Sequence, residues 1–320
     1  MKDEHIKKIV SFGHHEAIKH WLKINGIRPF TAATENDFYQ LLLKHIGEGK
    51  LQYDQLRRLT LELNEYGQKR VYIGKLIDFK TIQLRQRFEN HLKLSGENLS
   101  AIPERKLDKP ARPHLDYICW STQEVRIGYS ETHSEEKPDK ATRTWIKHEQ
   151  TNYITISANP SSGAVSIIMD APLETHPHQG TYRGEEVLGY LPYYRAKAIE
   201  LLGVEHIKSL DFIKISKGIA HDHERFERMR AVDLTKGNSR ITTVRRGEVT
   251  KDPAYTAGEK VDGDQRVYEA FGGYWLPEGS ENGLQRRIYM NLNRQEEIVQ
   301  FPGINLAREV EYAISRIRAI

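Results

Sequence analysis

The spacing of apolar residues changes along the chain, and this change constrains the fold more than any other feature of the sequence. Up to about residue 96, apolar residues recur at intervals of three and four, as in Ile18, Trp21 and Leu22, which is typical of helices with one buried face. Beyond about residue 114 the interval shifts toward two, in segments such as LDYICWS and NYITISA, which is typical of strands. The sequence therefore predicts an α+β protein: a small N-terminal helical bundle followed by a larger, mostly antiparallel β domain with a few helices.

The two patterns are separated by a segment without either period. Pro103, Pro110 and Pro113 interrupt a run of charged residues there, which favours a linker or an extended strap. We accordingly expect a helical basic module over residues 1–96, a Pro-rich linker or strap over 97–114, and an α+β domain over 115–320 with an amphipathic C-terminal helix.

Several local signals predict individual elements. Thr34 precedes three polar residues and predicts the start of a helix that ends near Gly47. Residues 82–94 predict a further helix, and the turn residues 159–163 predict a hairpin between two strands. We also expect a strand at DFIKIS, residues 211–216, and a short helix over residues 222–229.

Composition excludes some classes of protein. Hydrophobic residues make up 38% of the chain and the mean hydropathy is −0.65, so the chain is polar but has enough apolar residues to fold. No apolar run approaches the roughly 20 residues that span a bilayer, and the first ten residues carry mixed charges, so neither membrane insertion nor secretion is predicted. The single cysteine, Cys119, excludes an internal disulfide and a cysteine-built zinc site. We expect a cytoplasmic protein without a cofactor.

Catalytic motifs are weak or missing in the sequence. The Gly-rich phosphate-binding loops and the Gly-x-Ser-x-Gly elbow do not occur. Glu-x-Lys triplets begin at Glu48, Glu104 and Glu135, but none falls on an apolar strand after an aspartate, as a restriction-type nuclease needs. The sequence therefore favours a non-enzymatic protein. A metal-dependent nuclease built around His221 and His223 stays as an alternative.

Charge is distributed unevenly along the chain. Residues 1–96 carry 17 basic against 11 acidic residues, a net charge of +6, whereas residues 115–320 carry 27 against 30, a net charge of −3. A cationic face neutralises phosphates and gains affinity by releasing counterions. We therefore predict a nucleic-acid-binding face on the N-terminal helices, with duplex DNA as the favoured ligand. Its predicted residues are Arg57, Arg58, Lys69, Arg70, Lys75, Lys80, Arg85 and Arg87.

Other side chains suggest binding in the C-terminal part. Tyr274 and Trp275 follow two glycines, and such rings either stack on bases or pack in the core. Arg286 and Arg287 are adjacent on a predicted strand, so they point to opposite faces of it. The alternative function is protein interaction, in which the terminal helix holds a partner protein or a second copy of the chain.

The layout of the first half resembles the centromere protein N family. The resemblance covers roughly residues 14–158: a helical module, a Lys-Arg pair before an apolar segment (QKRVYIGKL), and an aromatic-rich sheet that includes WSTQEVRIGYSE. It implies DNA and nucleosome binding without catalysis, and it implies such a role, loosely, for Lys69 and Arg70.

Overall fold

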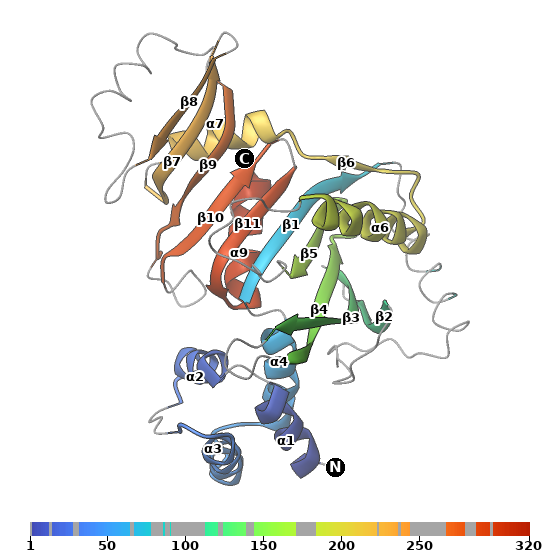
Figure 1. Ribbon diagram of the computed structural model, residues 1–320, viewed down its shortest axis with the longest axis vertical. Helices are drawn as coiled ribbons and strands as arrows, with labels where there is room; N and C mark the ends of the chain where they lie inside the picture. Colours follow the sequence, from blue (N-terminus) through green and yellow to red (C-terminus); the bar gives the residue numbers. More distant parts are fainter. Residues whose placement is uncertain are drawn as a thin grey trace. The chain divides into compact units, whose positions relative to one another are not determined.

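The chain folds into two units in a computed structural model (Figure 1). The structure describes residues 2–12, 15–27, 32–64, 67–77, 86, 90, 113–120, 124–138, 144–170, 184–222, 224–235, 238–243, 267–278, 286–294 and 297–320. The first unit comprises Met1–Tyr66 and Glu89–Ala158, and the second comprises Gly67–Phe88 and Asn159–Ile320. Among the described residues, no helix is both long and apolar enough to cross a membrane.

The first unit begins with helices α1 (Lys2–Phe12), α2 (His15–Ile24), α3 (Glu35–Gly47) and α4 (Tyr53–Asn64). Their buried apolar residues form one cluster, which includes Ile18, Trp21, Leu22, Phe38 and Leu56. The helical segment predicted at Ile18, Trp21 and Leu22 and the helix predicted to begin after Thr34 are therefore confirmed. The helix predicted over residues 82–94 and the strap predicted over residues 97–114 lie largely outside the described residues.

Helix α3 begins where the sequence predicts, because Thr34 caps it. The Thr34 hydroxyl accepts a hydrogen bond from the Asp37 backbone N–H at 3.2 Å, and the Asp37 carboxylate accepts one from the Thr34 N–H at 2.9 Å. The two residues thus satisfy backbone donors that the first helical turn leaves unpaired. The hydrogen bonds from the Thr34 and Ala33 backbones and from the Thr34 side chain lower the pKa of Asp37.

This lowered pKa predicts a pH dependence of stability. Because the folded state binds the Asp37 proton less tightly than the unfolded chain, where the pKa is about 3.9, the carboxylate stabilises the fold above that value. The contribution is lost as the pH falls through the folded pKa. Carboxyl NMR titration should place the Asp37 pKa below that of an unstructured aspartate, and Asp37→Asn should reduce the loss of stability on acidification. An unshifted titration would contradict the cap.

The first unit also contains the antiparallel strands β2 (His114–Trp120), β3 (Val125–Pro138) and β4 (Trp145–Ala158), in that order. Strands β2 and β4 contain the segments LDYIC and NYITISA, which the sequence predicts as strands. Cys119 on β2 is buried, and burial raises the pKa of its thiol, with a further rise from Glu124 opposed by Arg126. A buried thiol with a raised pKa packs as a small apolar group and is a poor nucleophile.

The second unit is built on an antiparallel sheet with the strand order β5-β1-β11-β10-β9-β7-β8, and β6 pairs with the end of β1. The bounds of these strands are β1 Gly67–Leu76, β5 Ala164–Asp170, β6 Ile207–Ser209, β7 Phe226–Thr235, β8 Asn238–Thr243, β9 Val267–Trp275, β10 Ile288–Asn293 and β11 Ile298–Asn305. The turn predicted before β5 is present, because the Asn159 side chain accepts hydrogen bonds from the N–H groups of Ser161 and Ser162. The mostly antiparallel α+β class is confirmed.

Strand β1 corrects the prediction of a helical module over residues 1–96. Gly67–Leu76 is a strand between β5 and β11, and its six residues 69–74 are all buried. A strand covered on both faces shows no alternation of apolar and polar residues, so its sequence does not display the period of two. The divisions predicted at residues 96 and 114 consequently do not coincide with the boundaries of the two units.

A second correction concerns DFIKIS. These residues form the start of helix α7 (Phe212–His221), and the predicted helix over 222–229 gives way to strand β7. Asp211 caps α7 by accepting hydrogen bonds from the backbone N–H groups of Ile213 and Lys214. Phe212, Ile215 and Ile219 are then buried at helical spacing, so the capping bonds and the helical period act together.

Helices α7 and α9 (Ala307–Ala319) cover one face of this sheet (Figure 1). Ile215 of α7 and Ile314 of α9 share an apolar cluster with Val71, Trp275 and Phe301 of the strands. The predicted amphipathic terminal helix is therefore present, but its apolar side is buried against its own unit. The prediction that the terminal helix holds a partner protein or a second copy stays a prediction, and such contacts would have to use the polar side of the helix.

Helix α6 (Gly184–Leu202) belongs to the other face of the sheet. The Arg195 guanidinium lies 5.3 Å from the centroid of the Tyr72 ring on β1, and it donates a hydrogen bond to the Ile207 carbonyl of β6. Burial raises the pKa of the Tyr72 hydroxyl, which lies 3.0 Å from the Ser209 hydroxyl. These contacts hold α6 over β1 and β6, on the face of the sheet opposite α7 and α9.

Candidate functional site

The predicted basic residues do not form one exposed helical face. Lys69 is 1% exposed and Arg70 is 6% exposed, both on the central strand β1, and Lys69 forms an ion pair with Asp170 of β5. Lys75, also on β1, is exposed. Arg57 and Arg58 lie on α4, but their side chains fall outside the description. Lys80, Arg85 and Arg87 lie outside the described residues altogether.

The charge asymmetry itself has a different origin from the one predicted. Residues 1–66, which contain α1 to α4, carry 10 basic against 9 acidic residues, a net charge of +1. Residues 67–96 carry 7 against 2, a net charge of +5. The described part of this second segment is mainly strand β1, whose two leading cations are buried. Helices α1 to α4 are therefore close to electrically balanced.

The region proposed for a metal contains little that could bind one. His221 is exposed at the end of α7, and Asp222 lies 3.9 Å from Arg225. His223 falls outside the described residues. Within the described ranges, no three His, Cys, Asp or Glu side chains gather closely enough to hold a metal ion.

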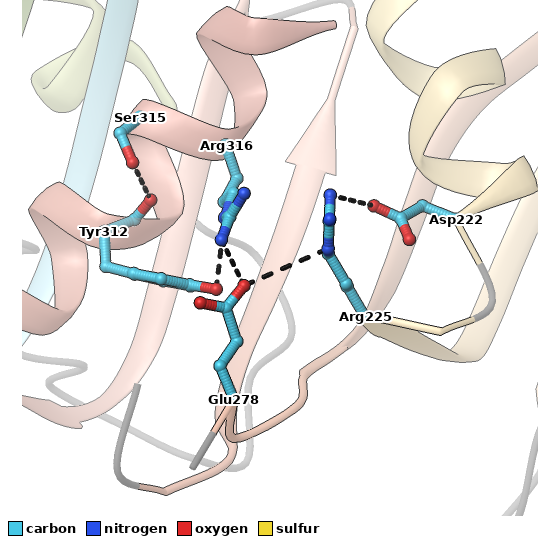
Figure 2. A network of polar contacts seen from close by, with 6 residues as sticks. All are labelled: Asp222, Arg225, Glu278, Tyr312, Ser315 and Arg316. Atoms are coloured by element: carbon cyan, nitrogen blue, oxygen red, sulfur yellow. Dashed lines mark hydrogen bonds and ion pairs between the residues drawn. The ribbon is translucent and has the colours of Figure 1, made fainter. Parts of the chain in front are cut away.

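A network of polar contacts next to this region ties three elements together (Figure 2). Glu278, after β9, pairs with Arg316 of α9 and lies 3.9 Å from the Arg225 Nε atom. The Arg316 Nε group donates a hydrogen bond to the Tyr312 hydroxyl at 3.1 Å. Burial raises the pKa of Tyr312, and the hydrogen bond with Glu278 raises it further. The charges of this network compensate one another, and its contacts link the end of α7, the segment after β9, and α9.

The other candidate is the face of the second unit's sheet opposite α7 and α9, over strands β7, β9, β10 and β11. We call this surface the polar face. Register and alternation place on it the residues Glu227, Gly272, Tyr274, Tyr289, Asn291, Asn293 and Gln300, and Arg287 joins them from the start of β10. Apart from Gly272, these side chains are partly or fully exposed. The described helix on this side of the sheet is α6, which contacts β5.

The aromatic rings and charges of the polar face are arranged in direct contact. Tyr274 and Tyr289 are cross-strand neighbours whose ring centroids lie 5.0 Å apart at an interplanar angle of 66°. The Arg287 guanidinium lies 4.5 Å from the centroid of the Tyr274 ring and pairs with Glu227 of β7. The Arg287 side chain is still 47% exposed. It therefore presents a cationic plane supported from below by an aromatic ring.

Gly272 leaves room on this face for two polar groups of β10. A Cβ atom at this position would lie 2.3 Å from the Asn291 amide oxygen and 2.5 Å from the Tyr289 hydroxyl. The absence of a side chain lets these two polar groups lie over β9. The amide and the hydroxyl are consequently held over Gly272, on the same face as Tyr274.

The structure separates residues that the sequence presents as equivalent neighbours. Trp275 is 1% exposed in the core, whereas Tyr274 lies on the polar face. Arg286 donates two hydrogen bonds of 2.7 Å to the buried Glu309 carboxylate of α9, and Arg287 lies on the opposite face. In the sequence, this site is indicated only by the adjacent aromatic residues Tyr274 and Trp275 and the adjacent arginines Arg286 and Arg287. The pairing of Tyr274 with Tyr289 has no signal in the sequence.

No family model matches the chain, and no curated protein matches it either. The resemblance to the centromere protein N family therefore stays a prediction.

Proposed function

We propose that this protein binds nucleic acid without catalysing a reaction, and that the polar face of the second unit is its contact surface. The observation that carries the proposal is the exposed Arg287 guanidinium lying on the Tyr274 ring. Proteins stack nucleobases on the planar guanidinium groups of arginine and on aromatic rings. Tyr289, whose ring contacts that of Tyr274, and Asn291, which lies over Gly272 on the same face, supply donors and acceptors for base edges.

The proposed surface differs from the one predicted from charge. Lys69 and Arg70 are buried, so they are poorly placed to neutralise phosphates. The balanced charge of residues 1–66 gives the N-terminal helices little electrostatic attraction for a polyanion. Arg287 combines exposure with an aromatic support, and this combination favours the polar face over the helices.

The proposal predicts binding that depends on Arg287. Fluorescence anisotropy with labelled oligonucleotides at low salt should show saturable binding by the full chain. Arg287→Ala should weaken it about fivefold or more, because a base-contacting arginine contributes roughly 1–3 kcal/mol.

Arg225→Ala provides the matched control. Its side chain is 50% exposed and lies near carboxylates, as that of Arg287 does, but it belongs to the α7–β9–α9 network. Binding should be unchanged in this variant. Equal losses in both variants, or no binding by the wild-type chain, would refute the proposal.

A further inference from the structure

Resting on the proposed nucleic-acid binding, we infer that the polar face selects single-stranded over duplex nucleic acid, with an unpaired base stacked on the outer side of the Arg287 guanidinium. The inner side of that guanidinium is occupied by the Tyr274 ring at 4.5 Å. A base on the outer side completes a three-layer stack of base, guanidinium and phenol. Such a stack needs the flat face of a base, which a duplex hides between neighbouring base pairs.

The position of the face within the sheet also disfavours a duplex. Strand β9, which carries Tyr274, is paired with β10 on one side and β7 on the other. The major groove of a duplex is about 12 Å wide and admits a helix or a two-stranded ribbon. A strand in the interior of a sheet cannot enter that groove. A flexible single strand can lie across the sheet and turn its bases toward it.

The charges of the face favour the same ligand. Arg287 is paired with Glu227 of the neighbouring strand, so the two charges largely cancel. Duplex binding relies heavily on neutralised phosphates and weakens steeply with salt. Stacking on this face releases few counterions, which predicts a shallow dependence of affinity on salt. The Asn291 amide lies over Gly272 on the same face, two residues along β9 from Tyr274, and supplies a further polar contact for a strand that crosses the sheet.

The test compares one oligonucleotide as single-stranded DNA, as single-stranded RNA and as a DNA duplex, by anisotropy over a salt series with the full chain. We expect both single strands to bind at least about tenfold more tightly than the duplex. Arg287→Lys keeps the charge but loses the plane, so it should weaken single-strand binding about fivefold or more while leaving the salt slope unchanged. Tyr274→Phe should keep the affinity, and Tyr274→Ala should lower it about 5- to 150-fold.

Tyr193→Ala is the control, since this exposed tyrosine lies on α6. Circular dichroism should show that each variant keeps the wild-type fold. Preference for the duplex, or full affinity in Arg287→Lys, would overturn the single-strand inference and leave the proposed function standing. If none of the three probes binds, both the single-strand inference and the proposed nucleic-acid binding are wrong.

Discussion

Replacing Asp170 with alanine is expected to lower the free energy of unfolding by about 3–5 kcal/mol. Asp170 pairs with Lys69, whose side chain is 1% exposed on the central strand β1. Without the carboxylate, an ammonium group stays in a site that water barely reaches, and the cost of its lost hydration is offset less than before. Urea denaturation followed by circular dichroism measures the difference.

Two controls separate this effect from the simple loss of an ion pair. Lys69→Met combined with Asp170→Ala removes both charges and should recover most of the lost stability, because a well-packed apolar replacement of a buried pair is often neutral. Glu200→Ala breaks the exposed pair of Glu200 with Lys197, whose atoms lie 2.7 Å apart, and should cost less than about 1 kcal/mol. If Asp170→Ala costs no more than Glu200→Ala, the Lys69 ammonium is not held in a dry site.

Trp275→Ala is expected to destabilise the protein by about 3–5 kcal/mol, the usual range for truncating a large aromatic side chain in a core. Trp275 is 1% exposed, packs at 5.2 Å between ring centroids against Phe226, and its indole N–H points at the Met290 sulfur at 3.0 Å. Thermal and urea unfolding should both report the loss.

Tyr274→Ala is the matched control for this prediction, because it truncates the adjacent aromatic residue on the other side of the same strand. The Tyr274 side chain is partly exposed, so its removal leaves no closed cavity and should cost clearly less stability. The two variants should also differ in nucleic-acid affinity, because Tyr274→Ala removes a ring of the proposed binding surface. Similar destabilisation by both variants would contradict the assignment of one ring to the core and the other to the polar face.

Local chemistry allowed some elements to be predicted with accuracy. Helix α3 begins at the predicted residue because its start is decided by hydrogen bonds between Thr34 and Asp37, only three positions apart. The terminal helix α9 likewise shows its buried stripe in its own spacing. The wrong assignment of DFIKIS arose because a six-residue window with apolar residues at both spacings fits a strand and a helix alike. Its outcome depended on the Asp211 cap and on packing against the sheet.

The candidate site was only partly predictable. The sequence predicts that Arg286 and Arg287 point to opposite faces of a strand, but for Tyr274 and Trp275 it leaves open whether the rings stack on bases or pack in the core. Because side chains alternate along a strand, adjacent residues point to opposite faces of the sheet, but the alternation does not show which face is covered by helices. Packing of α7 and α9 on one side decided that, and the pairing of β9 with β10 then brought Tyr289 beside Tyr274.

The sequence by itself determined the α+β class, most of the helices and strands, and the presence of adjacent aromatic and arginine residues, because these depend on spacing and capping between near neighbours. Tertiary structure alone decided that the cationic segment QKRVYIGKL becomes a buried central strand. It also decided that Arg287, rather than Lys69 or Arg70, is left exposed. The physical reason is that burial of β1 comes from pairing with β5 and β11, which lie far along the chain, and no local pattern encodes such partners.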